Sequence, residues 1–169
     1  MPTKIQQLQA ILGVPADGAW GPRSQSALDT VIHGTNLPDG THKVLASSFA
    51  DPADVRAFRA CIRAGGTKED CFKVGDNGRG CWGDDTTTTE PQCALPPEDM
   101  EERWGSIDAA RHKMVSVTAN GRTVLCRLTD RMPRRANIKN GRGIDLTPGA
   151  CAALGLRPPV ETSATWSWV

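Results

Sequence analysis

The pattern of apolar and polar residues predicts two short helices at the start of the chain. Apolar side chains recur there with helical spacing, at Ile5, Leu8, Ile11 and Leu12. Gly13 follows as a C-cap residue, and residues 15–18 have the composition of a turn. Pro22 and Ser24 then open a second helix, whose apolar positions are Ala27, Leu28 and Val31. Residues 1–36 are therefore predicted to be a small helical module.

The next stretch, residues 37–69, reads as a linker followed by a helix. Residues 34–43 are polar and rich in turn-forming residues. Asp51 can cap a helix, Pro52 suits its first turn, and Gly65 and Gly66 would end it.

From about residue 70 the pattern changes to that of strands. Residues 113–118 and 123–128 alternate apolar with polar side chains around Asn120-Gly121, which predicts a hairpin with a tight turn. A short amphipathic helix is expected over residues 148–154, ending at Gly155. The final strand, residues 165–169, places Trp166 and Trp168 on one face.

Composition narrows the class of protein. The 169 residues carry 20 Lys and Arg against 19 Asp and Glu, a net charge of +1, so a nucleic-acid-binding protein is not expected. No run reaches the roughly 18 apolar residues of a membrane span, and the N-terminal residues lack the apolar core of a signal peptide. The 17 Gly and 12 Pro favour strands and loops over a helical bundle.

Six cysteines in a small chain suggest disulfides and an oxidising, extracytoplasmic location. Pairing between sequence neighbours predicts Cys61–Cys71, Cys81–Cys93 and Cys126–Cys151. Without an export signal, this location implies lysis, a specialised secretion system or a leader absent from this sequence. There is no C-x-x-C pair, and the three His are scattered, so we expect no metal site and no organic cofactor.

The N-terminal pattern resembles the small helical peptidoglycan-binding module found on many cell-wall hydrolases. The segment Asp17-Gly18-Ala19-Trp20-Gly21-Pro22 is its distinctive part. The usual closing aromatic and Gln are replaced here by residues 32–35. The resemblance implies affinity for the wall, with Trp20 as a contact residue. The alternative is a helical hairpin that only caps the next domain.

Residues 70–169 resemble the six-stranded double-psi β-barrel shared by bacterial expansins, the rare-lipoprotein-A family and family-45 endoglucanases. A strand ends in an Asp-x-x-Pro turn at Asp130, and a hydrophobic-Asp-Leu-Thr segment at Asp145 opens a helix that finishes at Leu154-Gly155. The fold class is therefore expected to be mainly β, with a small helical part. In the family-45 enzymes the residue that matches Asp145 is the general acid, whereas in expansins it is essential without hydrolysis.

Asp145 lies between Ile144 and Leu146, and this apolar frame would raise its pKa by desolvation. A charged Asp130 nearby would raise that pKa further. Such an acid could protonate the leaving oxygen of a glycosidic bond. The plainer alternative is that Asp145 caps the helix that follows and Asp130 caps its own turn.

Further candidate residues surround this pair. Asp85, or its neighbour Asp84, occupies the place of an acidic residue in rare-lipoprotein-A proteins, so either Asp130 or Asp85 is expected to be the partner of Asp145, unless Asp84 and Asp85 form a solvated turn. Trp82 could stack on a sugar or be buried. A loop without acids carries Arg131, Arg134, Arg135, Lys139 and Arg142. It could attract an anionic polymer, although a solvated loop is the simpler interpretation. The acidic run at residues 98–102 is also expected to be solvated.

These features predict a monomeric protein that binds and cleaves peptidoglycan or a related wall polysaccharide. Because no second carboxylate is assured, a lytic transglycosylase fits better than a two-acid glycosidase. One alternative is an expansin-like protein that loosens the wall without cleaving it. Another is a disulfide-rich barrel that inhibits a protein partner. A cysteine peptidase would need a thiolate beside an imidazole, and His112 is the only His in the predicted barrel region.

Overall fold

The computed structural model describes residues 2–12, 14–21, 24, 40–138 and 140–169. The chain divides into two compact units, residues 1–39 and residues 40–169. The predicted second helix, with Ala27, Leu28 and Val31, lies outside the described residues.

In the first unit, α1 spans Lys4–Ile11 and begins with a capping box between Thr3 and Gln6. The predicted apolar stripe is not buried, because Ile5, Leu8 and Ile11 are 39%, 37% and 80% exposed. The buried side chain of α1 is Gln9, which is 1% exposed. Its amide reaches the turn after the helix, where Nε2 donates to Asp17 Oδ1 at 2.8 Å and Oε1 accepts from Gly18 N at 2.9 Å.

The second unit contains six strands and several short helices. Its strands are β1 (Thr41–Ser48), β2 (Gln92–Leu95), β3 (Met114–Ala119), β4 (Arg122–Arg131), β5 (Arg142–Leu146) and β6 (Glu161–Trp168). Its α-helices are α3 (Pro52–Arg63), α4 (Lys68–Cys71), α5 (Pro97–Trp104) and α6 (Pro148–Ala153). Two 3-10 turns, η1 (Asp108–Ala110) and η2 (Arg135–Asn137), complete the set.

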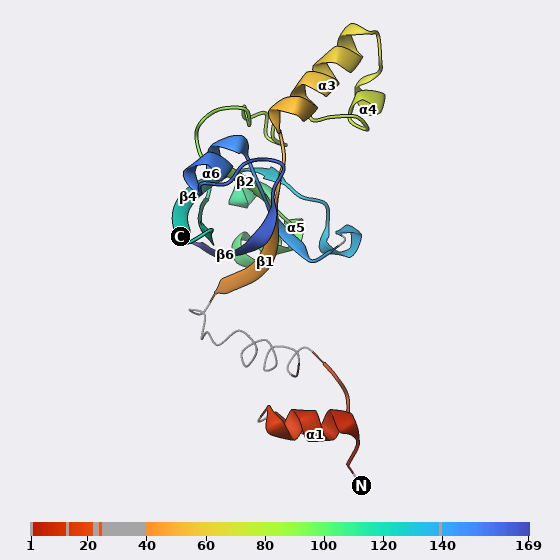
Figure 1. Cartoon of the computed structure of the whole chain (residues 1–169), viewed down its shortest axis with the longest axis vertical. Helices are drawn as coiled ribbons and strands as arrows, with labels where there is room; N and C mark the ends of the chain where they lie inside the picture. The colour runs from red at the N-terminus through yellow and green to blue at the C-terminus, as the bar shows by residue number, and fades with distance from the viewer. Residues whose placement is uncertain (1, 13, 22–23, 25–39, 139) are drawn as a thin grey trace. The chain divides into compact units, whose positions relative to one another are not determined.

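The strands form a closed barrel in the order β1-β5-β2-β4-β3-β6, which confirms the predicted six-stranded barrel. Two neighbouring pairs, β1–β5 and β2–β4, are parallel, and the other pairs are antiparallel. In Figure 1 the orange strand β1 runs beside the blue strand β6, and this pair closes the barrel.

The barrel begins earlier in the sequence than predicted. Its first strand is residues 41–48, inside the segment expected to be a linker and a helix, so a start at residue 70 is wrong. The strand is easily missed because it is made largely of small and polar residues. Its partners β5 and β6 lie about a hundred residues away along the chain, so no local pattern marks it.

The local predictions hold. Asn120 and Gly121 have φ of 51° and 69° and connect β3 to β4 in the predicted hairpin. The helix α3 follows Asp51, with Pro52 in its first turn, and ends just before Gly65. In β6, Trp166 is 1% exposed and Trp168 packs edge-on against it, with ring centroids 5.6 Å apart.

Candidate functional site

A row of four side chains crosses four adjacent strands of the barrel. Asp145 on β5 is paired with Ser47 on β1 and, on its other side, with Ala94 on β2. Ala94 is in turn paired with Asp130 on β4. The neighbours of Asp145 and Ala94 along their strands belong to the hydrophobic core, so by strand alternation the row lies on the opposite face from that core. The two predicted acids therefore share one face, with the methyl group of Ala94 between them.

Two β-bulges create this alignment. Between Leu128 and Asp130, β4 has one residue more than β2 has between Cys93 and Ala94. In a regular strand Asp130 would point the same way as Leu128, into the core, and the bulge turns it outward. A second bulge lies between Leu45 and Ala46 of β1, where β5 contributes the extra residue.

Asp145 is held by Ser47, whose Oγ donates a hydrogen bond to Asp145 Oδ1. Burial raises the pKa of Asp145, and the charge of Asp51 raises it further, whereas Ser47 and Arg142 act in the opposite direction. The expected effect of desolvation is therefore present, but the acid that adds to it is Asp51 and not Asp130. The capping alternative for Asp145 is wrong, because Thr147 is the N-cap of α6.

Asp130 is tied to the backbone of a neighbouring loop. Its Oδ1 accepts from the amides of Cys81 and Arg131, both at 2.8 Å. Gly80 packs so closely against the same place that a Cβ there would lie 2.1 Å from the Thr129 carbonyl oxygen. Burial raises the pKa of Asp130, and the charge of Asp76 adds to this effect. Asp130 therefore holds the loop at residues 80–81 in place and is also a member of the row.

Asp51 is a third acid of this region, which the sequence suggested only as a helix cap. Its side chain makes no capping bond to α3. Instead Ser48 Oγ donates to Asp51 Oδ2 at 2.9 Å, while Oδ1 is buried with no hydrogen-bond partner. Burial raises the pKa of Asp51, and Asp54 and Asp76 contribute to the rise. The adjacent Ser47 and Ser48 therefore hold two acids, Asp145 and Asp51, at the end of β1.

The other predicted site residues bond to different groups. Asp85 accepts from the Thr87 hydroxyl and amide at 2.6 and 2.9 Å, and these bonds lower its pKa. Trp82 packs partly against the core and donates from Nε1 to Asp108 at 3.0 Å. The structure does not place Asp85 with the row, because its carboxylate is used in its own turn.

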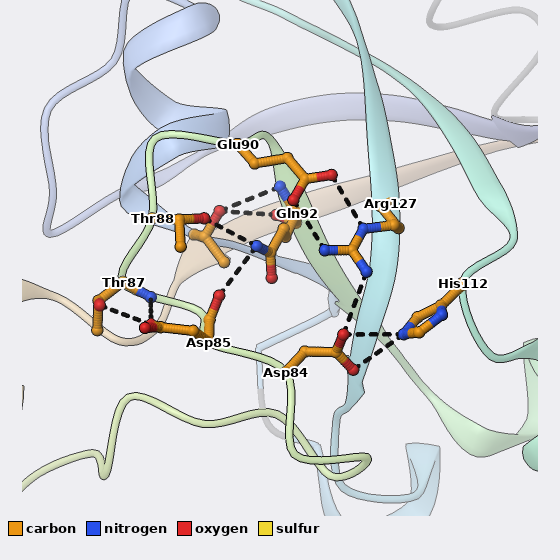
Figure 2. A network of polar contacts seen from close by, with 9 residues as sticks. Asp84, Asp85, Thr87, Thr88, Glu90, Gln92, His112 and Arg127 are labelled. Carbon is orange, nitrogen blue, oxygen red and sulfur yellow. Dashed lines mark hydrogen bonds and ion pairs between the residues drawn. The ribbon is translucent and has the colours of Figure 1, made fainter.

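Asp84 belongs to an ion-pair network that the sequence did not reveal (Figure 2). Its carboxylate lies 2.9 Å from His112 Nε2 and 3.1 Å from Arg127 Nη1. Arg127 also binds Glu90 at 2.8 Å. The pKa of Asp84 is lowered although burial alone would raise it, because His112 and Arg127 stabilise the charged form. The network anchors the loop before β2 to β4, and a permanently charged carboxylate there is a poor proton donor.

Two residues of the basic loop form ion pairs with the acidic run. Arg134 binds Glu101 at 2.8 Å, and Arg135 bonds to Asp99, whose side chain is 1% exposed. The run at residues 98–102 is thus engaged in ion pairs and is not simply solvated. Further along, Arg142 binds Glu161 at 2.6 Å, and Lys139 lies outside the described residues. Arg131 is exposed beside Asp130, and Trp20 is 36% exposed in the first unit.

The cysteines follow only part of the prediction. Cys61 and Cys71 form a disulfide, with Cα atoms 5.5 Å apart. The predicted pairs Cys81–Cys93 and Cys126–Cys151 are wrong, because these four are free thiols and the last three are buried in the barrel core. Burial and the nearby Asp130 raise the pKa of Cys81 to about 12, which is the opposite of an activated nucleophile.

The described residues contain neither a cluster of metal-ligating side chains nor a membrane-spanning helix. In the described part of the chain, no group of three or more His, Cys, Asp or Glu side chains is arranged to hold a metal ion. None of the helices described here is long and apolar enough to cross a bilayer.

No protein-family profile and no curated protein matches the sequence. Among solved structures, a Streptomyces papain inhibitor is similar with 20% identity and a TM-score of 0.45, over 79% of this chain and 99% of that chain. An expansin of Clavibacter michiganensis is similar with 15% identity and a TM-score of 0.46, over 76% of this chain. A mutant of that expansin in complex with cellohexaose matches with 13% identity and a TM-score of 0.45, also over 76% of this chain. The chain spans half the length of these expansin chains.

Proposed function

We propose that the barrel binds a glycan strand of the bacterial wall at Asp145 and Asp130, the two partly exposed acids of the row, and that Asp145 protonates the glycosidic oxygen. The observation that carries this proposal is the environment of Asp145. Its side chain is half-buried, and burial together with the charge of Asp51 raises its pKa. A carboxylic acid that keeps its proton toward neutral pH is what general acid catalysis on a glycoside requires.

The spacing of the two acids in the row argues against a retaining glycosidase. Asp130 and Asp145 are separated by β2, so their Cα atoms are two strand spacings apart, about 9–10 Å. A retaining glycosidase needs its two carboxyl groups about 5–5.5 Å apart. Asp130 is also bonded to two backbone amides, which leaves it poorly suited to act as a nucleophile.

A lytic transglycosylase reaction needs only one carboxyl group, because Asp145 can both donate the proton and take one back. The carboxyl proton passes to the leaving oxygen as the bond between that oxygen and the anomeric carbon breaks. A hydroxyl of the same sugar bonds to the anomeric carbon and releases its proton to the Asp145 carboxylate. The products are a shortened chain and an anhydro sugar, and the acid is regenerated.

Binding without cleavage is the second candidate function. It is favoured by the hydrogen bond from Ser47, which lowers the pKa of Asp145 and occupies one carboxyl oxygen. In that case the row would contact the glycan without transferring a proton.

The remaining proposals concern the whole chain. We assign wall affinity to the first unit, where the turn after α1 is built on Gln9 and Trp20 is exposed. The Cys61–Cys71 disulfide favours an extracytoplasmic location. We propose that the protein acts there as a monomer.

The test is incubation of purified sacculi with the wild type and with Asp145→Asn, followed by mass analysis of the soluble products. Wild type should release anhydro-muropeptides, and Asp145→Asn should release them on the order of a hundredfold more slowly. The amide can still accept the Ser47 hydrogen bond, so the melting temperature should change little. Asp70→Asn, an exposed carboxylate on α4, is the matched control and should keep full activity.

Each alternative result has a distinct meaning. If Asp145→Asn cleaves at the wild-type rate, the catalytic assignment is wrong. Binding of sacculi by wild type with no soluble product would replace cleavage with the second candidate. Reducing ends in place of anhydro sugars would indicate hydrolysis. If wild type neither binds nor cleaves sacculi, both candidates fail, and inhibition of papain-type proteases becomes the assay to perform.

A further inference from the structure

Helix α3 presents a row of three arginines to solvent. Arg56, Arg59 and Arg63 are exposed, and at about 100° per residue they fall within an arc of roughly 60° on the helix. With a rise of about 1.5 Å per residue, they are spaced roughly 4.5 and 6 Å apart along the axis. In the described part of the chain, none of them is within ion-pair distance of a carboxylate, although the charge of Arg59 helps to lower the pKa of Asp85. They differ in this respect from Arg134, Arg135 and Arg142, which are paired.

The arginine face, formed by Arg56, Arg59 and Arg63, is not needed to hold α3 in place, because the chain packs against the other side of the helix. Cys61, on that other side, is joined to α4 by the disulfide. Gly75 lies against the helix backbone, where a Cβ would be 2.2 Å from the Asp54 carbonyl oxygen. Phe58 meets Phe72 with ring centroids 5.0 Å apart. Figure 1 shows α3 and α4 side by side at one end of the second unit.

Two hollows lie one after the other along the arginine row and share Arg59. The first has a volume of about 250 Å³, and its lining includes Val55, Arg56 and Thr87. The second has a volume of about 260 Å³, and its lining includes Ile62, Arg63 and Asn77. Each hollow therefore combines guanidinium groups with an apolar wall and a polar side chain.

This combination suits one kind of ligand. Guanidinium groups bind carboxylate and phosphate oxygens in a bidentate manner, and the apolar walls can cover the non-polar face of a sugar or polyol unit. The first hollow also includes Ala50 and Pro52, the two neighbours of Asp51, so it lies next to the acids of the candidate site. A nucleic-acid ligand is disfavoured by the net charge of +1 and by the absence of an exposed aromatic side chain among the lining residues.

We propose that the arginine face of α3 is a second binding site, which takes a glycan or polyol chain carrying carboxylate or phosphate groups. The glycan character of the ligand rests on the proposed function, whereas the need for negative charge rests on the three unpaired arginines. The site would hold an anionic wall polymer alongside the row that contains Asp145.

The test compares binding of three polymers by the full chain. The probes are polygalacturonate, which carries carboxylates, poly(glycerol phosphate), which carries phosphates, and neutral dextran. Wild type should bind one or both anionic polymers with an affinity that falls as salt is raised, because exposed charges are screened. The comparison of the first two probes identifies which anionic group is preferred.

The variant is Arg56→Gln/Arg59→Gln/Arg63→Gln, and its matched control is Lys43→Gln/Arg111→Gln/Arg157→Gln. Both remove three positive charges from exposed positions, so the net charge changes equally. An exposed ion pair contributes a factor of roughly two to five, so loss of three should weaken anionic binding by roughly 10- to 100-fold. The control variant should stay within about threefold of wild type.

Several results would overturn this inference. Equal losses in the two triple variants would mean that net charge alone is responsible. Failure of wild type to bind either anionic polymer, or equally tight binding of a DNA duplex, would also refute it. The proposed function fails separately, because cleavage of sacculi by Asp145 can be absent while anionic binding through α3 persists.

Discussion

Replacing Asp51 with asparagine should stabilise the protein at neutral pH, although the residue is buried. Asp51 is 8% exposed, and its Oδ1 has no hydrogen-bond partner, while Oδ2 is satisfied by Ser48. A buried polar group without a partner costs about 1–3 kcal/mol, and a charged one costs more, so it is the charge and not the missing partner that Asp51→Asn removes. Asp51→Asn keeps an acceptor for Ser48 and removes a charge that burial and two neighbouring acids oppose. We expect a gain of about 1 kcal/mol, or about 3–5 °C in melting temperature for a domain of this size.

The gain should depend on pH with a definite sign. Folding raises the pKa of Asp51 above 3.8, so the folded state holds this proton more tightly than the unfolded state. The contribution of Asp51 to stability is therefore fully present below pH 3.8 and is lost as the pH rises through the folded pKa. Wild type and Asp51→Asn should consequently have similar melting temperatures below pH 3.8 and differ most at a pH above the raised pKa of the folded state.

Thermal unfolding at several pH values measures this difference, with Asp54→Asn as the control. Asp54 is an exposed carboxylate in the first turn of the same helix, so its replacement changes the charge equally and removes only its repulsion of Asp51, which stays buried and ionisable. Because the charge of Asp51 raises the pKa of Asp145, Asp51→Asn should also move the alkaline limb of sacculus cleavage to lower pH. A melting temperature at pH 7 that is unchanged or lower in Asp51→Asn, or a shift equal to that of Asp54→Asn, would refute the reasoning.

Two further predictions concern the cysteines and α6. Alkylation of the unfolded, unreduced protein should label four cysteines and leave Cys61 and Cys71 joined, and mass mapping that finds six labels or none would contradict the structure. Thr147→Ala should lower the free energy of unfolding by about 1–3 kcal/mol, because Thr147 Oγ1 accepts from the amides of Ala150 and Gln92. Denaturant titration measures this loss, and Thr147→Ser, which keeps the hydroxyl, should lose less than half as much.

The parts of the fold that the sequence predicts are those set by local chemistry. The Asn120-Gly121 turn requires a positive φ at both residues, and the composition of this turn alone indicates the hairpin. The helix α3 is marked by Pro52 at its start and glycines at its end. The strand β1 is missed because its identity depends on pairing with distant strands, and its own residues are too small and polar to show a strand pattern.

The same distinction applies to the candidate site. Asp130 and Asp145 can be selected from the sequence, but their common face depends on two bulges, which no local motif reports. Asp51 precedes a proline at a helix start, where a capping role is the natural interpretation, and only the structure shows that Ser48 holds it instead. The three buried cysteines pack as small apolar residues. The even number of cysteines in the chain therefore does not mean that all of them form disulfides.

The position of the single disulfide means that assembly of the barrel and formation of the cross-link can be separate steps. Cys61–Cys71 closes a loop between residues 10 positions apart and joins α3 to α4, and it does not link any two strands. A cross-link over so short a loop restricts the unfolded chain by about 2.5–3 kcal/mol, and that restriction acts on α3 and α4. The barrel can therefore assemble by strand pairing in a reducing compartment, with its core thiols intact. Oxidation would then fix the two helices, so that the arginine face becomes rigid only once the disulfide has formed.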